Sequence, residues 1–121
     1  MSVLRKLRIL DAAYKDLLAV PQPVRKMTGF VLDKVQRGEH HSSVKPLKGR
    51  DFAGAYEIRI DHDSDTYRSV YALNIGKAIY LLDIFQKKAK KGVATPKKDL
   101  DRIRARIKLA KEIEDNEQNG N

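Results

Sequence analysis

The chain has 121 residues, of which 41% are hydrophobic and 34% are charged, and its formal net charge is +9. This length and composition predict one globular domain over residues 1–121, located in the cytoplasm. Because there is no Cys, disulfides, thiolate metal ligands and a Cys nucleophile are excluded. The longest apolar run, Ala78–Leu82, is too short to cross a bilayer, and the positive charge favours an anionic partner.

A strand and a short helix are predicted at the start of the chain. Residues 4–10 are compatible with a β-strand, and residues 11–19 predict a helix that Asp11 caps. The side chains expected to point inward from this helix are Ala12, Leu17 and Leu18.

A second helix is predicted from Pro23 to Gly38, because apolar residues recur there with helical spacing. Pro21 and Pro23 separate it from the first helix, and Gly38 suits the position just after a helix C-terminus. Its expected buried stripe consists of Val24, Met27, Phe30, Val31, Leu32 and Val35. The short connection predicts that the two helices form an antiparallel hairpin.

Three strands are predicted in the middle of the chain, after a loop at residues 39–54. Residues 55–60 and 67–75 alternate between two sets of side chains, and a polar turn at residues 61–65 joins them. Residues 78–85 are nearly all apolar, which predicts a central strand covered on both faces. Because the connections are short, these strands should form an antiparallel meander.

A last helix is predicted after Thr95 and Pro96, which suit an N-cap and the first helical position. Its inward side chains are expected to be Leu100, Ile103, Ile107 and Ala110. The polar tail, residues 112–121, is expected to fray. The order β-α-α-β-β-β-α indicates an α+β fold, in which an N-terminal helical hairpin and a C-terminal helix pack on an antiparallel sheet.

The first candidate site is the charged face of the meander. Alternation along two neighbouring strands places Glu57, Arg59 and Arg68 close together on one face. A solvated outer face with a cross-strand ion pair is one interpretation, because exposed faces are usually charged. The other is an anion-binding face that holds one carboxylate among cations.

Positive charge is concentrated directly after the apolar strand. Residues 86–111 contain eleven Lys or Arg against two Asp. The first of these cations form either a solvated linker or a group of point charges for a phosphate. They are Lys87, Lys88, Lys90 and Lys91. Phe85, at the end of the strand, is either a core residue or a ring on which a base stacks.

Two other polar segments do not predict a metal site. The aspartates in residues 61–65 are spaced like the start of a calcium loop, but the Gly and Glu that such a loop needs are absent. The neighbouring His40 and His41 have no carboxylate at ligand spacing. There is also no Gly-rich phosphate loop or nucleophile elbow. An enzyme with this sequence is therefore expected to need no metal and no cofactor.

Several segments, in this order and spacing, resemble the RelE-type toxins of bacterial toxin–antitoxin systems, and within them the HigB-like, phage-derived branch. The resemblance covers roughly residues 20–110. Its segments are residues 21–40, Lys45–Gly49, Glu57–Arg59, Tyr67-Arg68, Tyr71, Phe85–Lys91 and Thr95-Pro96. It implies the small α+β fold of that family, in agreement with the element order.

The resemblance also implies an activity, which is ribosome-dependent cleavage of mRNA by attack of a 2′-hydroxyl on the adjacent phosphate. Catalytic roles then fall on Glu57, Arg59, Arg68 and Lys88. Arg68 would contact the phosphate, Lys88 would lie near the leaving group, and Glu57 would be a candidate base. Contacts to RNA would come from Lys48, Phe85, Lys87, Lys90 and Lys91.

The partners implied are the ribosome, mRNA in the ribosomal A site and a cognate antitoxin of the helix-turn-helix type, with no membrane. Two other functions remain open at this point. One is a ParE-like toxin that inhibits a topoisomerase, and the other is a basic RNA-binding module without catalytic activity. The cations around Glu57 favour the nuclease.

Overall fold

The computed structural model describes residues 4–87 and 95–119, with side chains up to residue 117. Five strands, three α-helices and one short 3-10 helix are present in these ranges. In chain order they are β1 (Lys6–Ile9), α1 (Asp11–Ala19), α2 (Gln22–Gln36), β2 (Val44–Pro46), η1 (Arg50–Phe52), β3 (Ala55–His62), β4 (Asp65–Ile75), β5 (Ala78–Lys87) and α3 (Lys97–Asn119). The predicted α+β class is confirmed.

The strands form a single five-stranded sheet in the order β1-β5-β4-β3-β2. The predicted meander is present, since β3, β4 and β5 pair antiparallel with short connections. The sheet as a whole is mixed, because β1 pairs with β5 in parallel. The strand predicted at residues 78–85 is therefore second from the edge, although it is covered on both faces as expected. Strand β2 lies in a segment that was predicted to be a loop.

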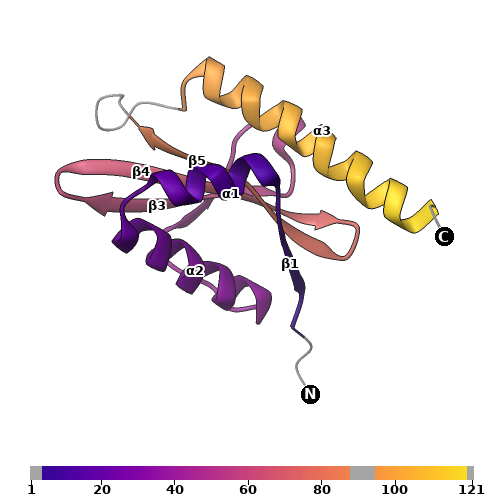
Figure 1. Cartoon of the computed structure of the whole chain (residues 1–121), viewed down its shortest axis with the longest axis horizontal. Coiled ribbons are helices and arrows are strands. Elements are labelled where there is room, and N and C mark those ends of the chain that lie inside the picture. Colours follow the sequence, from indigo (N-terminus) through magenta and orange to yellow (C-terminus); the bar gives the residue numbers. More distant parts are fainter. Residues whose placement is uncertain (1–3, 88–94, 120–121) are drawn as a thin grey trace.

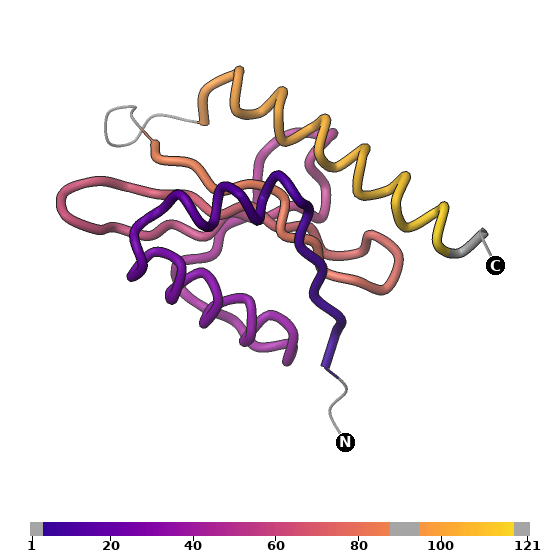
Figure 2. Tube along the Cα trace, viewed as in Figure 1, coloured from indigo at the N-terminus to yellow at the C-terminus, as the bar shows by residue number. Residues whose placement is uncertain are grey.

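Helices cover both faces of this sheet (Figure 1). Helices α1 and α2 pack on one face, over β5 and β3 respectively, and α3 packs on the other, across β5 and β4. The tube in Figure 2 shows α1 and α2 lying below α3, with the sheet passing behind and between them. Over the described residues, no helix combines the length and apolarity that spanning a membrane requires.

The hairpin helices bury a narrower stripe than the sequence predicted. On α2 the buried residues are Val24, Thr28, Val31, Leu32 and Val35. Met27 and Phe30 were expected to be buried, but they are 40% and 53% exposed. Leu18 on α1 is likewise 54% exposed, while Ala13 is fully buried. Residues at the margin of the apolar stripe of each helix therefore stay in solvent.

The ends of two helices differ from their predictions. The residue before α1 is Leu10, which provides no side-chain cap, and Asp11 lies inside the first turn of the helix. At the other end of the chain, the tail predicted to fray is helical as far as Asn119. It is held because Arg8 on β1 binds both Glu114 and Glu117. Burial of Ile103, Ile107 and Ala110 in α3 agrees with the sequence.

Candidate active site

Side chains on the α3 face of the sheet lie in rows across the strands. Strand pairing places Arg59 opposite Arg68, and Arg68 opposite Phe85. The next residues along these strands on the same face are Glu57 on β3 and Lys87 on β5. We call Glu57, Arg59, Arg68 and Lys87 the cation cluster. The alternation of β-strands thus brings together the three charged residues that the sequence predicted as neighbours.

Glu57 and Arg68 form the centre of the cation cluster. The Nη1 atom of Arg68 donates a hydrogen bond to Oε1 of Glu57, and their side chains are only 13% and 12% exposed. Thr95, which immediately precedes the Pro at the start of α3, donates a second bond to Oε2 of Glu57 at 3.4 Å. Hydrogen bonds to both of its oxygens therefore hold the Glu57 carboxylate in place. A solvated surface pair, which was one interpretation of the sequence, does not describe this arrangement.

Arg68 also has a hydrogen-bond donor that is not used within the described part of the chain. Its Nε atom is buried and has no hydrogen-bond partner among the described residues. A buried donor without a partner costs about 1–3 kcal/mol, so it is rarely left in a structure without a reason. An anion that reached this N–H would satisfy it. This favours the second interpretation of the sequence, an anion-binding face.

Lys87, which the sequence predicted as an RNA contact beyond the end of the strand, belongs to this cluster. Strand β5 continues through Lys87, whose residue is only 9% exposed. Burial lowers the pKa of its ammonium group, and the neighbouring Arg68 lowers the pKa further, while Glu57 opposes this. An ammonium group with a lowered pKa is easier to deprotonate, and so better suited to giving a proton away.

Arg59 is the most exposed member of the cation cluster, and Phe85 lies beside the cluster. The Arg59 side chain is 43% exposed and reaches Asp61, with 3.5 Å between Nε and Oδ1. Phe85 is half-buried, and the guanidinium of Arg102 lies over its ring, 5.6 Å from the centroid. Phe85 is therefore neither a fully buried core residue nor a bare ring, because one of its faces is already occupied.

A buried ionic network fixes α3 beside the cluster. Asp83 on β5 is fully buried and accepts two hydrogen bonds from Arg102, at 2.7 and 3.1 Å. Arg106 reaches the same carboxylate at 3.2 Å, and it also binds Asp16 on α1 at 2.7 Å. Burial raises the pKa of Asp83, and both arginines oppose the rise. The sequence analysis missed this network, although an Asp inside an apolar strand is a signal that a cation must be nearby.

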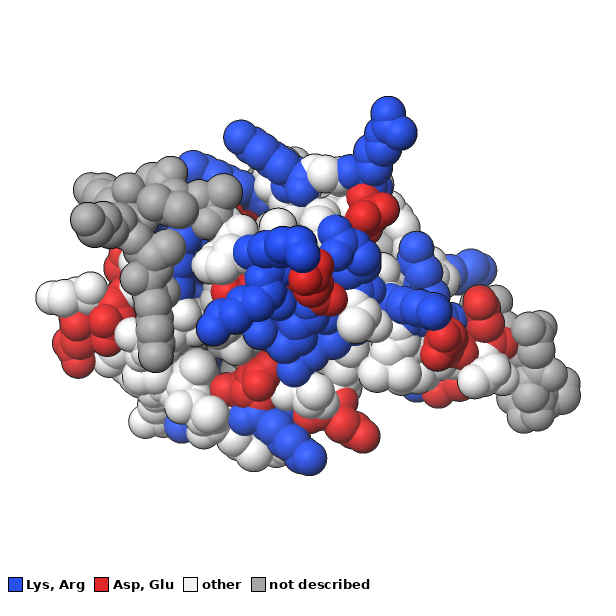
Figure 3. All heavy atoms as spheres, turned by 90° about the horizontal axis from the view of Figure 1, so that it is seen from above, with Lys and Arg blue, Asp and Glu red and all other residues white. Residues whose placement is uncertain are grey.

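The remaining RNA-contact residues predicted from sequence are placed only in part. Lys48 lies in the exposed loop between β2 and η1. Lys88, Lys90 and Lys91 lie outside the described residues. Viewed from the α3 side (Figure 3), Lys and Arg side chains occupy much of the centre of the molecule, with acidic side chains between them.

The chemistry available at the cation cluster follows from its geometry. It offers one carboxylate held by Arg68 and Thr95, one buried unsatisfied guanidinium N–H and one ammonium group, all on one face of the sheet. Such a set can hold a phosphate, accept a proton from a hydroxyl group and supply a proton to a leaving oxygen.

Comparisons with known proteins agree with the fold. Residues 15–108 match the model of the family described as "Phage derived protein Gp49-like". A comparison with curated proteins gives no match. Among solved structures, the Mycobacterium tuberculosis toxin–antitoxin complex RelBE2 is similar, with a TM-score of 0.52 and 21% identity over 70% of this chain and 100% of that chain. A mutant of the Escherichia coli toxin RelE in the free state has a TM-score of 0.53 and 18% identity over 68% of this chain and 82% of that chain.

Proposed function

We propose that this chain is the toxin of a type II toxin–antitoxin system and that it cleaves mRNA on the ribosome. The chain belongs to the phage-derived Gp49-like family and has the fold of RelE toxins, and both findings support the proposal. The observation that supports this most strongly is the cation cluster on the α3 face of the sheet. A ribosome-dependent enzyme can tolerate a sparse catalytic set, because the ribosome supplies much of the substrate's orientation.

The proposed reaction is an internal transfer of the phosphate. The 2′-oxygen forms a bond to the neighbouring phosphorus while the bond from phosphorus to the 5′-oxygen breaks. Glu57 takes the proton from the 2′-hydroxyl, and Lys87 gives a proton to the departing 5′-oxygen. Arg68, through its free Nε–H, binds the phosphate oxygens on which negative charge develops. The products are a 2′,3′-cyclic phosphate and a free 5′-hydroxyl.

Lys87 takes the leaving-group role here because it faces Arg68 and Glu57 within the described structure. Lys88, to which the sequence resemblance assigned that role, lies outside the described residues. We assign Lys88, Lys90, Lys91 and Lys48 to RNA phosphates, and Arg59 to the rim of the cation cluster. Because phosphate contacts depend on counterion release, binding to ribosomal RNA should weaken as salt increases.

The partners follow from the same proposal. One of the similar structures is a toxin–antitoxin complex, which supports an antitoxin as the neutralising partner of this chain. The basic chain, with its net charge of +9, suits an acidic antitoxin segment. The proposed site of action is the cytoplasm, where ribosomes and mRNA are found.

Mapping of transcript ends after induced expression tests the proposal. Cuts within translated reading frames that disappear when translation of the same transcript is blocked are the expected result. Uncut transcripts in arrested cells, together with inhibition of a topoisomerase, would instead identify a ParE-like toxin. Uncut transcripts in cells whose growth is not arrested would instead identify a basic RNA-binding module without catalytic activity.

A further inference from the structure

A separate pocket lies on the opposite face of the sheet from the cation cluster. It has a volume of about 280 Å³, and its lining includes Arg5, His40, His41, Val44, Tyr56 and Tyr71. Tyr56 and Glu57 are consecutive in β3, so their side chains point to opposite faces. A ligand in this pocket, which we call the Tyr56 pocket, is therefore separated from the cation cluster by the sheet itself.

The floor of the Tyr56 pocket is aromatic. Tyr56 and Tyr71 pair across β3 and β4, and their rings stack with centroids 5.5 Å apart. Tyr71 is only 3% exposed, and burial raises its pKa to about 12, so its hydroxyl stays protonated at neutral pH. Aromatic floors of this kind bind planar or apolar groups.

One cation, Arg5, lies on the rim of the pocket. Arg5 makes one side-chain hydrogen bond, 3.3 Å to Asn74, and has no carboxylate partner among the described side chains. The only carboxylate in the lining is Glu39, which pairs with Lys34 at 3.5 Å. His41 is held in place by Ser43, whose Oγ lies 2.7 Å from its Nδ1. The occupant should therefore combine an apolar or aromatic group with negative charge.

Two features favour a protein partner over RNA. Tyr and Arg around an apolar centre are the residues that dominate binding energy at protein interfaces. An RNA site would need several Lys or Arg on phosphates, and Arg5 is the only one in the pocket lining. Figure 3 shows a dense Lys and Arg surface on the α3 side.

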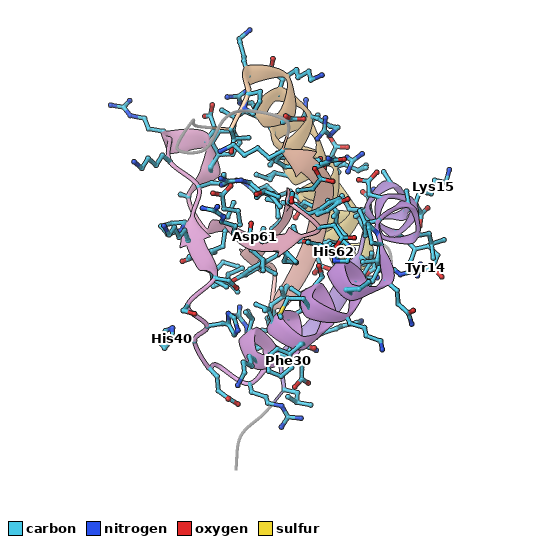
Figure 4. The ribbon with its side chains drawn as sticks, turned by 90° about the vertical axis from the view of Figure 1, so that its left-hand side faces the viewer. Tyr14, Lys15, Phe30, His40, Asp61 and His62 are labelled. Atoms are coloured by element: carbon cyan, nitrogen blue, oxygen red, sulfur yellow. The ribbon has the colours of Figure 1, made fainter. Side chains whose placement is uncertain are left out.

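The apolar surface continues from the pocket onto α2. The ring of Phe30 meets that of His41 edge-on, with centroids 6.0 Å apart, and Phe30 is 53% exposed. Met27, one turn earlier on α2, is 40% exposed. Figure 4 shows Phe30 and His40 at the same end of the molecule, on the helix and on the loop that follows it. A partner anchored in the pocket would thus find further apolar surface beside it.

Strand β2, at the edge of the sheet beside the pocket, is poorly suited to pairing with a strand from a partner. Strand β2 is three residues long and ends in Pro46, which has no backbone N–H to offer. The backbone N–H of Val44 already binds the His41 carbonyl at 3.1 Å. A partner must therefore be recognised through a side chain that enters the pocket, not through an added strand.

We propose that the Tyr56 pocket anchors an acidic peptide segment of a protein partner, by accepting one aromatic side chain whose flanking carboxylates meet Arg5 and the histidines. Under the proposed function, on which this assignment of the partner rests, the segment belongs to the antitoxin. Binding there would leave the cation cluster uncovered, so the anchor contributes affinity from the face opposite to the active site.

The test is an NMR titration of the full chain with a blocked peptide, Asp-Glu-Phe-Glu-Asp. Signals of His41 and Tyr56 should shift, and the same peptide with Ala in place of Phe, or with Lys in place of the acids, should not shift them. Arg5→Ala should weaken binding about tenfold, as loss of a charge-assisted hydrogen bond does. Lys15→Ala, which removes an exposed cation from α1 (Figure 4), should change binding by less than about twofold.

Absence of shifts at His41 and Tyr56 up to about 5 mM peptide, beyond the weakest useful affinities, would overturn the proposal. So would shifts confined to the α3 face, or tighter binding of 5′-AMP than of the peptide in this pocket. Cleavage of mRNA is measured separately. If the chain cleaves mRNA but does not bind the peptide, only the proposal for the Tyr56 pocket is refuted. If the chain binds the peptide but does not cleave mRNA, only the proposed reaction is refuted.

Discussion

Arg68 binds Glu57 from the neighbouring strand, yet keeps its buried Nε–H without a partner among the described residues. The pair is asymmetric as a result. The carboxylate is held by Arg68 and Thr95, whereas one N–H of the guanidinium has no hydrogen-bond partner in the described part of the chain. A structural ion pair would be expected to use up its buried donors. The proposed phosphate contact therefore rests on this unsatisfied N–H.

Replacement of Arg68 tests the phosphate contact. Arg68→Ala should lower the rate of mRNA cleavage about a hundred- to a thousandfold, because a donor to developing negative charge is lost. The rate is measured by primer extension in a reconstituted translation reaction. Arg37→Ala provides the control, since it removes an arginine that is 51% exposed on the surface of the hairpin. An equal loss in both variants would mean that net charge alone is responsible.

Replacement of Glu57 tests the base. Glu57→Gln keeps the size of the side chain and one of its two oxygen acceptors, but it removes the carboxylate that takes the proton. Cleavage should fall about a hundredfold or more in protein that is shown to be folded. Unchanged cleavage in a folded Glu57→Gln protein would show that another group takes the proton.

The pH profile of cleavage tests Lys87. Burial and Arg68 lower the pKa of its ammonium group below 10.5. As the pH rises through this lowered value, the proton needed by the leaving oxygen is lost, so the rate should decline on the alkaline side. Lys87→Arg should move that decline to higher pH, because a guanidinium stays protonated. Identical alkaline limbs in the two proteins would remove Lys87 from the reaction.

Stability at neutral pH depends on Asp83. Asp83→Asn should lower the free energy of unfolding by about 3 kcal/mol, because Arg102 and Arg106 lose a buried carboxylate. Denaturant unfolding at pH 7 measures this. The matched variant Asp33→Asn breaks an exposed pair with Arg37 on α2, and should cost no more than about 0.5 kcal/mol. Similar losses in both would mean that the network does not hold α3.

Acid sensitivity depends on Glu114. Hydrogen bonds from Tyr80 at 2.6 Å and Arg8 at 2.8 Å lower its pKa below 4.5 in the folded chain. Its carboxylate therefore stabilises the fold at neutral pH, and this contribution is lost as the pH falls through the lowered value. Wild type should be more stable than Glu114→Gln at pH 7, with the difference shrinking below pH 4.5. A difference that does not depend on pH would contradict this assignment.

Strand alternation was enough to predict one face of the site. Glu57, Arg59 and Arg68 were placed together from sequence, because a period of two fixes which side chains share a face. Lys87 was predicted to contact RNA but not to belong to the strand, since the apolar run ends at Phe85 and the lysines after it resemble a linker. Continuing the same alternation by two residues would have placed Lys87 beside Phe85 on the face of Arg68.

Other features could not be predicted, because they depend on contacts between distant segments. Strand β2 has three residues and exists only through pairing with β3. Helix α3 extends to Asn119 because Arg8, more than a hundred residues earlier, binds Glu114 and Glu117. The Tyr56 pocket likewise draws on the N-terminal segment, the end of α2 and three strands, which no local pattern brings together.

The most direct measurement combines purified chain, ribosomes and a defined mRNA, with the cut ends analysed chemically. The account predicts cleavage only when the mRNA is being translated, 2′,3′-cyclic phosphate and 5′-hydroxyl ends, and loss of cleavage in Arg68→Ala. Ends of another chemistry, equal cleavage of mRNA that is not translated, or full activity in folded Arg68→Ala would contradict it.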